Sequence, residues 1–157
     1  MRNDYIESGN QHYYAERLHE SIADYTQAIE QMPDNAIAYQ KRARVYIDVG
    51  RYLLALNDLA ESIRLNPNDG LSYYYRGLAY YYLKDDVNAI INFEESIRIE
   101  PNDMTIHTMY GNIFAEREDY ERAIAIYERA LQIAPNDVML NIFKNRAERK
   151  LEESQSK

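Results

Sequence analysis

The sequence predicts an all-α solenoid in which four copies of a two-helix unit follow one another along the chain. The chain has 157 residues and only four prolines, which stand 34 residues apart, at Pro33, Pro67, Pro101 and Pro135. Proline cannot continue a helix, because it lacks the N–H donor and clashes with the preceding turn. Each proline is followed by one Asp and one Asn, residues that favour the N-cap of the next helix. A fixed period of this length is typical of a stacked repeat.

The period also fixes where small and large side chains fall. We number each unit so that its proline takes place 32, which gives the units 2–35, 36–69, 70–103 and 104–137. Place 8 is small in every unit, with Gly9, Ala43, Gly77 and Gly111. Place 24 is large, with Tyr25, Leu59, Phe93 and Tyr127. Because a larger residue at place 8 would overpack a close contact between helices, we expect the two helices of every unit to pack in the same way.

Apolar residues at helical spacing predict two helices in each unit. In the second unit, for example, Ile37, Tyr39, Ala43, Tyr46 and Ile47 precede a break at Gly50. The same reasoning predicts helices over 4–15, 18–31, 36–49, 52–65, 70–83, 86–99, 104–117 and 120–133.

A last helix is predicted over residues 138–153. Its apolar residues Leu140, Phe143, Ala147 and Leu151 lie on one side, and charged residues cover the rest. A helix with a polar outer face is what the open end of a solenoid requires, so we interpret it as a capping helix. Residues 154–157 are expected to fray.

These features resemble the tetratricopeptide repeat, whose pattern is an aromatic residue, Leu-Gly, Tyr, Ala, Phe and Pro at set places. The resemblance covers residues 2–137. It implies a right-handed α-solenoid in which the first helix of each unit lines a concave surface. It also implies a protein–protein interaction module, an adaptor or scaffold, rather than an enzyme.

Two arginines depart from the repeat pattern. Arg42 and Arg76 occupy place 7, where the family usually has Leu. Partly buried charges need partners, because removing one partner leaves the other stranded. We therefore predict that Arg42 bonds Asp58 or Asp24, and that Arg76 bonds Asp58 or Asn92.

Composition excludes several other classes of function. The chain has no Cys, so it has no disulfide, no zinc site of thiolates and no cysteine nucleophile. Its net charge of −8 disfavours general binding of nucleic acid, which needs clustered cations. No apolar run is long enough to cross a bilayer, and residues 1–7 do not form a signal peptide. We expect a cytoplasmic protein that does not insert into membranes.

No group of residues suggests catalysis or a cofactor. His12 and His107 stand at packing places and His19 stands at a turn, and no two of them make a metal-ligand pair on one helix face. The five glycines stand singly, so there is no phosphate-binding loop. We therefore predict no catalytic residue, no metal and no cofactor.

Tyrosine is the unusual component, with 16 Tyr, 3 Phe and no Trp. The family resemblance implies that places 2, 5, 6, 9, 12 and 13 of each unit look into the concave groove. Tyrosine suits a binding surface because it supplies area, rigidity and one polar tip. The predicted peptide-binding residues are Asn10, Tyr13, Ile37, Lys41, Arg44, Leu71, Tyr74, Tyr75, Leu78, Tyr81, Met109 and Asn112. The alternative is that several of these rings pack on the neighbouring unit.

Two hypotheses about function follow. The first is an adaptor whose tyrosine-rich groove holds a peptide segment of a partner protein. The second is a structural protein that forms homo-oligomers through the same surfaces. The groove carries Lys41 and Arg44 beside Glu7, Asp48 and Glu116, which does not fix the sign of the ligand.

One specific ligand of the family is disfavoured. Some cochaperone members grip a C-terminal carboxylate with Lys and Asn on one first helix, Asn on the next, and Lys and Arg on the third. The corresponding residues here are Ile6, Asn10, Lys41, Leu71 and Tyr75, of which only Asn10 fits.

Overall fold

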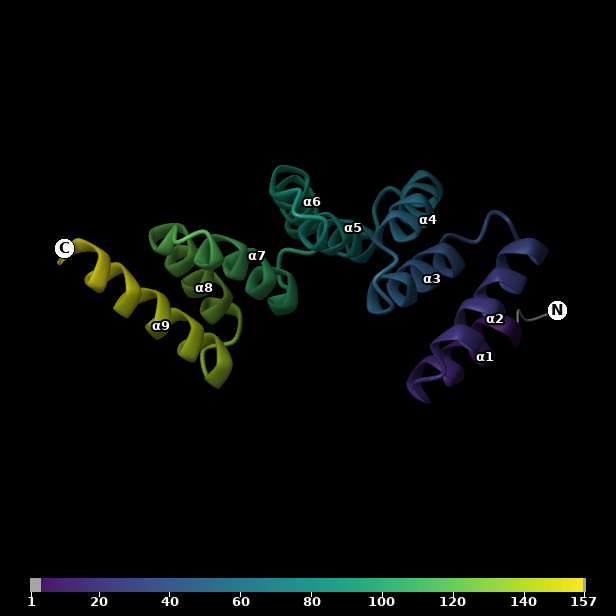
Figure 1. Ribbon diagram of the computed structural model, residues 1–157, viewed down its shortest axis with the longest axis horizontal. Helices are drawn as coiled ribbons and strands as arrows, with labels where there is room; N and C mark the ends of the chain where they lie inside the picture. The colour runs from purple at the N-terminus through teal and green to yellow at the C-terminus, as the bar shows by residue number, and fades with distance from the viewer. Residues whose placement is uncertain (1–3, 157) are drawn as a thin grey trace. The chain divides into compact units, whose positions relative to one another are not determined.

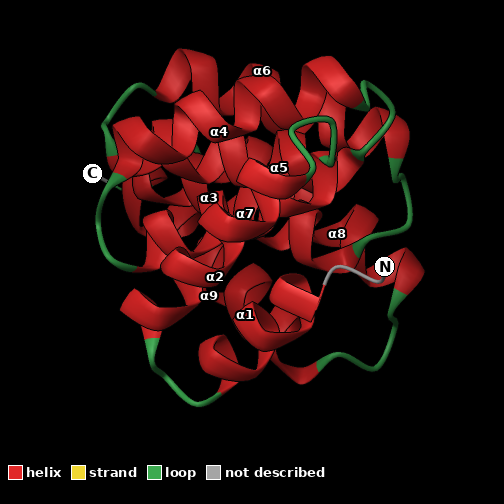
Figure 2. Ribbon diagram, turned by 90° about the vertical axis from the view of Figure 1, so that its right-hand side faces the viewer, coloured by secondary structure: helices red, strands yellow, loops and turns green. Residues whose placement is uncertain are grey.

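The structure, a computed structural model, describes residues 4–156, and within them it contains nine helices and no strand (Figures 1 and 2). This confirms the predicted all-α fold. The helices are α1 (Asp4–Tyr14), α2 (Leu18–Gln31), α3 (Ala36–Asp48), α4 (Tyr52–Leu65), α5 (Gly70–Tyr82), α6 (Asp86–Ile99), α7 (Met104–Glu116), α8 (Tyr120–Ile133) and α9 (Val138–Gln155). The last helix continues through Ser154 and Gln155, beyond its predicted end. The start of the first predicted repeat, at residues 2 and 3, lies outside the described residues.

The chain forms two compact units, one through Asn92 and one from Phe93 onwards. The first contains α1 to α5 and the beginning of α6, and the second contains the rest of α6 and α7 to α9. In the first unit α1 packs on α2, α2 on α3, α3 on α4, and α4 on α5. In the second, α7 packs on α8 and α8 on α9.

The residues after the prolines start the first helices as predicted. The Asn35 side chain accepts hydrogen bonds from the backbone N–H groups of Ile37 and Ala38, at 3.1 and 3.3 Å. Asp103 and Asp137 cap α7 and α9 in the same way. Asp69 also stands at the N-cap of α5, but its carboxylate accepts from the Ser72 hydroxyl, at 2.5 Å, instead of from a backbone N–H.

The turn between the two helices of each 34-residue repeat has one geometry in all four repeats. Place 15 has a positive φ each time, at Glu16 (57°), Gly50 (72°), Lys84 (65°) and Glu118 (61°). The residue after it donates its N–H to a carbonyl five residues back, as Arg51 does to Tyr46 at 2.7 Å. This is the Schellman ending of a helix. Glycine adopts this backbone without strain, yet only the second repeat has glycine at this place, at Gly50.

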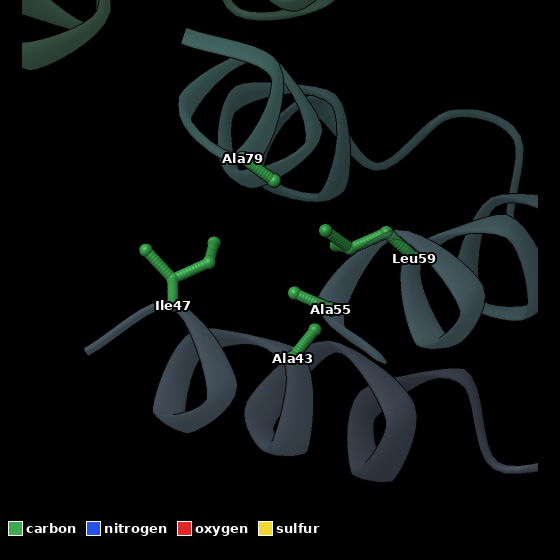
Figure 3. Close-up of a cluster of buried hydrophobic side chains, with 5 residues drawn as sticks. All are labelled: Ala43, Ile47, Ala55, Leu59 and Ala79. Atoms are coloured by element: carbon green, nitrogen blue, oxygen red, sulfur yellow. The ribbon is translucent and has the colours of Figure 1, made fainter. Parts of the chain in front are cut away.

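The core of the first unit lies where three helices meet. Ala43 and Ile47 of α3, Ala55 and Leu59 of α4, and Ala79 of α5 point toward one another, and all are buried (Figure 3). The alanines keep the helices close, and Leu59 fills the space between them.

Glycine at place 8 makes room for the ring at place 24. A Cβ atom on Gly9 would lie 2.5 Å from Cε1 of Tyr25, and a Cβ on Gly111 would lie 2.5 Å from Cε1 of Tyr127. In the second repeat the larger Ala43 is paired with the smaller Leu59. In these three repeats the two places are therefore matched in size, and place 8 is small because the helices approach closely there, as the sequence pattern predicted.

We expect Gly111→Ala to lower the free energy of unfolding by about 1–2 kcal/mol. Overpacking costs about 1–3 kcal/mol, while replacing a helical Gly with Ala returns up to about 1 kcal/mol. The ring cannot easily move, because Tyr127 is buried and its hydroxyl donates to Asn112 Oδ1 at 2.7 Å.

A double-mutant cycle measured by urea denaturation tests this packing. Adding Gly111→Ala to Tyr127→Leu recreates the Ala43–Leu59 pair, so in that background the alanine should no longer destabilise. An equal loss in both backgrounds would show that the ring is not the cause.

The two unusual arginines bond as predicted. Arg42 forms two hydrogen bonds with Asp58, from Nε to Oδ2 and from Nη2 to Oδ1, both 2.8 Å long. Its third nitrogen, Nη1, donates to the Thr26 hydroxyl at 3.0 Å. Arg76 Nε donates to Asn92 Oδ1 at 2.5 Å. These side chains tie the first helix of a repeat to its second helix through polar contacts.

Candidate functional site

The first helices of the first unit carry a cluster of tyrosines and cations that we call the tyrosine face. It consists of Tyr13 of α1, Lys41, Arg44 and Asp48 of α3, and Tyr74, Tyr75, Leu78 and Tyr81 of α5. All except Asp48 are half-buried, and Asp48 is exposed. Seven of the eight are residues predicted from the sequence, and Asp48 was noted there only for its charge.

Tyr13 is held in place by two residues of α3. Its hydroxyl donates to Asp48 Oδ2 at 2.8 Å. The Arg44 guanidinium carbon lies 4.4 Å from the centre of the Tyr13 ring, within the range of a cation–π contact. Burial raises the pKa of Tyr13, and its hydrogen bond to Asp48 raises it further. The Tyr13 hydroxyl is therefore protonated at neutral pH, and its contacts with Asp48 and Arg44 orient the ring.

Tyr75 and Leu78 belong partly to the core. Both pack against the buried cluster around Leu59. Burial raises the pKa of Tyr75, and the positive charge of Arg44 partly offsets that rise. These two side chains therefore support the helix packing beneath the face, and their contact with a ligand stays a prediction.

Tyr74 and Tyr81 lie further from that cluster. The Tyr74 ring centre lies 5.4 Å from that of Tyr75. The Tyr81 ring centre lies 5.3 Å from that of Tyr82 and 5.4 Å from the Lys84 ammonium. These two rings stand seven residues apart on α5, so they fall on one side of the helix.

Lys41 is a half-buried cation beside a second cation. Burial lowers its pKa, and the charge of Arg44, three residues along α3, lowers it further. Among the described residues no carboxylate forms an ion pair with it. Ile37, one turn earlier on the same helix, is 56% exposed, and Leu71 at the start of α5 is half-buried.

The two predicted asparagines are engaged within their own repeats. Asn10 Oδ1 accepts from the Tyr25 hydroxyl at 2.9 Å, and Asn112 Oδ1 accepts from the Tyr127 hydroxyl at 2.7 Å. Each can offer a ligand only its amide donors while these bonds hold. Asn112 and the half-buried Met109 belong to α7 in the second unit, so the structure does not join them to the tyrosine face.

The second unit contains a hollow of about 350 Å³ that the sequence predicted only in part, since Asn112 and Glu116 were placed in the groove but residues of α9 were not. It is lined by Asn112, Ala115, Glu116, Tyr120, Tyr127, Phe143, Arg146, Ala147 and Lys150. We had interpreted the last helix only as a cap, and therefore left it out of the binding surface. A signal was present, because residues 139, 142, 143, 146 and 150 fall on one face of a helix.

Two histidines have structural contacts. His12 Nδ1 lies 2.7 Å from Asp24 Oδ2, and His107 Nε2 lies 2.9 Å from the Pro101 carbonyl oxygen. Over residues 4–156 no three His, Cys, Asp or Glu side chains are placed to hold a metal ion. Among the same residues no helix combines the length and the apolar character needed to cross a membrane.

Comparison with known sequences identifies the family. Tetratricopeptide repeat models match residues 36–69, 70–103 and 105–137. The chain belongs to the tetratricopeptide repeat family, a class of helical repeat proteins that serve as scaffolds for protein–protein interaction. No curated protein matches the chain.

Solved structures share the fold at low sequence identity. The crystal structure of MamA protein aligns with 97% of this chain and 88% of its own, at 17% identity and a TM-score of 0.77. A chain of the APC/C hetero-tetramer Cut9-Hcn1 covers 91% of this chain and 29% of its own, at 19% identity and a TM-score of 0.83. YrrB, a TPR protein with an unusual peptide-binding site, covers 94% of this chain and 76% of its own, at 19% identity and a TM-score of 0.73.

Proposed function

We propose that this chain is an adaptor whose tyrosine face binds a peptide segment of a partner protein. The observation that carries the proposal is the combination of half-buried rings on α1 and α5 with the half-buried Lys41 cation on α3. Aromatic rings supply contact area at small entropic cost, while a cation fixes orientation. Ile37 and Leu71, which belong to the same unit, are proposed as further contacts.

Lys41 and Arg44 favour a peptide that carries an acidic residue. Bringing a carboxylate to a partly desolvated ammonium creates a charge-assisted hydrogen bond, which is stronger than a bond between neutral groups. Arg44 already contacts Tyr13, whereas Lys41 has no ion pair among the described residues. We therefore propose that Lys41 binds the carboxylate and that Tyr74 and Tyr81 contact apolar side chains around it.

The comparisons support this proposal at the level of the class. YrrB is a TPR protein with a peptide-binding site, and its likeness to this chain extends to the fold alone.

Selection from a random peptide display library tests the proposal. Immobilised wild-type chain serves as bait, and the Tyr74→Ala/Tyr81→Ala variant serves for counter-selection. We expect enrichment of peptides that combine apolar residues with Asp or Glu. Lys41→Gln should then weaken binding of the acidic peptides and leave their Asn or Gln analogues unaffected.

Two results would contradict the proposal. One is a selection in which no peptide distinguishes the wild type from the double variant. The other is light scattering in which the wild type self-associates with rising concentration while the double variant stays monomeric, because the face would then be an interface between copies of the chain.

A further inference from the structure

The hollow in the second unit has a rigid aromatic floor. The ring centres of Tyr127 and Phe143 lie 6.0 Å apart, with planes inclined by 30°. Tyr127 is buried, and its hydroxyl is fixed by Asn112. Burial raises the pKa of Tyr127 to about 12, so the floor is uncharged at neutral pH. A volume of about 350 Å³ is at the lower end of ligand pockets and suits one large side chain.

The face of α9 that borders the hollow changes character along its length. Met139 and Ile142 are 55% and 50% exposed, although they are apolar. One and two turns later the same face carries Arg146 and Lys150, which line the hollow. A helix that served only to end the solenoid would have a polar outer surface. Exposed apolar groups beside a hollow are instead typical of an interaction site.

The charge at the hollow is opposite to that of the chain as a whole. The protein has a net charge of −8, yet the hollow is lined by two cations and one acid, Glu116. Arg146 has no ion pair among the described residues. Within the described part of the chain Lys150 pairs with Glu153 alone, on its own helix, at 2.9 Å and with both side chains exposed, and such pairs contribute little. Both cations are therefore available to a carboxylate.

We propose that the hollow between α7, α8 and α9 is a second binding site, for a partner peptide in which a large apolar side chain stands next to a carboxylate. The apolar side chain enters the hollow and packs on Phe143 and Tyr127. The carboxylate pairs with Arg146, and further apolar residues of the peptide lie over Met139 and Ile142. This site lies wholly within the second unit and does not depend on the tyrosine face.

Fluorescence anisotropy with synthetic peptides tests the site. The probe is a fluorescein-labelled peptide with the core Phe-Asp-Asp between Gly-Ser spacers, and the comparison peptides carry Phe-Asn-Asn or Ala-Asp-Asp. The full chain is used with Tyr74→Ala/Tyr81→Ala, so that the tyrosine face does not contribute. We expect Phe-Asp-Asp to bind best and both comparison peptides to bind more weakly.

Arg146→Gln should weaken binding of Phe-Asp-Asp about tenfold, the loss expected for one hydrogen bond to a charged group. The matched control is Arg129→Gln, because Arg129 of α8 is exposed and lies outside the hollow. It carries the same change of charge and should leave affinity within about twofold, as expected for a distant surface charge. Amide NMR signals of residues 112, 127 and 146 should move on titration.

Three outcomes would overturn the proposal. Equal binding of all three peptides would show that neither the Phe side chain nor the carboxylates are recognised. Equal loss in Arg146→Gln and Arg129→Gln would show only a general charge effect. Self-association of the chain that Arg146→Gln abolishes in light scattering would make a second copy, not a partner peptide, the occupant.

Discussion

Replacing Arg42 with Ala should lower the free energy of unfolding by about 3–5 kcal/mol, the usual cost of removing one partner from a buried ion pair. Arg42 gives Asp58 two hydrogen bonds of 2.8 Å, and Asp58 is only 6% exposed. Without the guanidinium the carboxylate stays buried with its charge uncompensated. The same substitution also removes the hydrogen bond to Thr26.

Urea denaturation followed by circular dichroism measures this loss. Arg64→Ala is the matched control, because Arg64 forms an exposed pair with Glu61 at 2.9 Å, and its removal should cost less than about 1 kcal/mol. Arg42→Leu/Asp58→Leu should recover most of the stability, since apolar residues of similar volume often replace a buried pair without loss. If Arg42→Ala were as mild as Arg64→Ala, the pair would be a surface contact.

The double substitution Tyr74→Ala/Tyr81→Ala should weaken binding of a selected peptide about a thousandfold. Truncating a central aromatic residue of an interface typically costs about 2 kcal/mol or more, and two such losses amount to about three orders of magnitude. Neither ring belongs to the buried cluster around Leu59, so helicity and melting temperature should remain nearly those of the wild type.

The matched control for this prediction is Leu53→Ala/Ile91→Ala. These side chains are 68% and 54% exposed and lie on the second helices α4 and α6. Binding measured by anisotropy should be unchanged in this variant. If the melting temperature of the tyrosine variant fell sharply instead, the rings would be part of the core and the alternative interpretation from the sequence would hold.

The helix boundaries could be predicted because they depend on local chemistry. The prolines and the Asn35-type caps act within one turn of the chain, and α3, α5, α7 and α9 begin where they predicted. The pairing of Arg42 with Asp58 was also predictable, because the repeat period brings places 7 and 23 to one level on two antiparallel helices.

Other features depend on packing that one sequence does not reveal. Glu16, Lys84 and Glu118 adopt the left-handed backbone although nothing in their chemistry favours it, because the repeated turn imposes it. The asparagine oxygens of the predicted groove are occupied by Tyr25 and Tyr127, a contact that joins different helices. The hollow beside α9 was not predicted as a binding site, because its floor combines Tyr127 with Phe143 of the helix interpreted as a cap.

Mapping a bound peptide by amide chemical shifts tests the central claim, that the tyrosine face binds a partner segment. The peptide enriched in the display selection would be titrated into the isotope-labelled chain of 157 residues. The proposal predicts that the largest shifts gather at residues 13, 41, 44, 74, 75 and 81. Shifts confined to α2, α4 and α6, with those six residues unmoved, would contradict it.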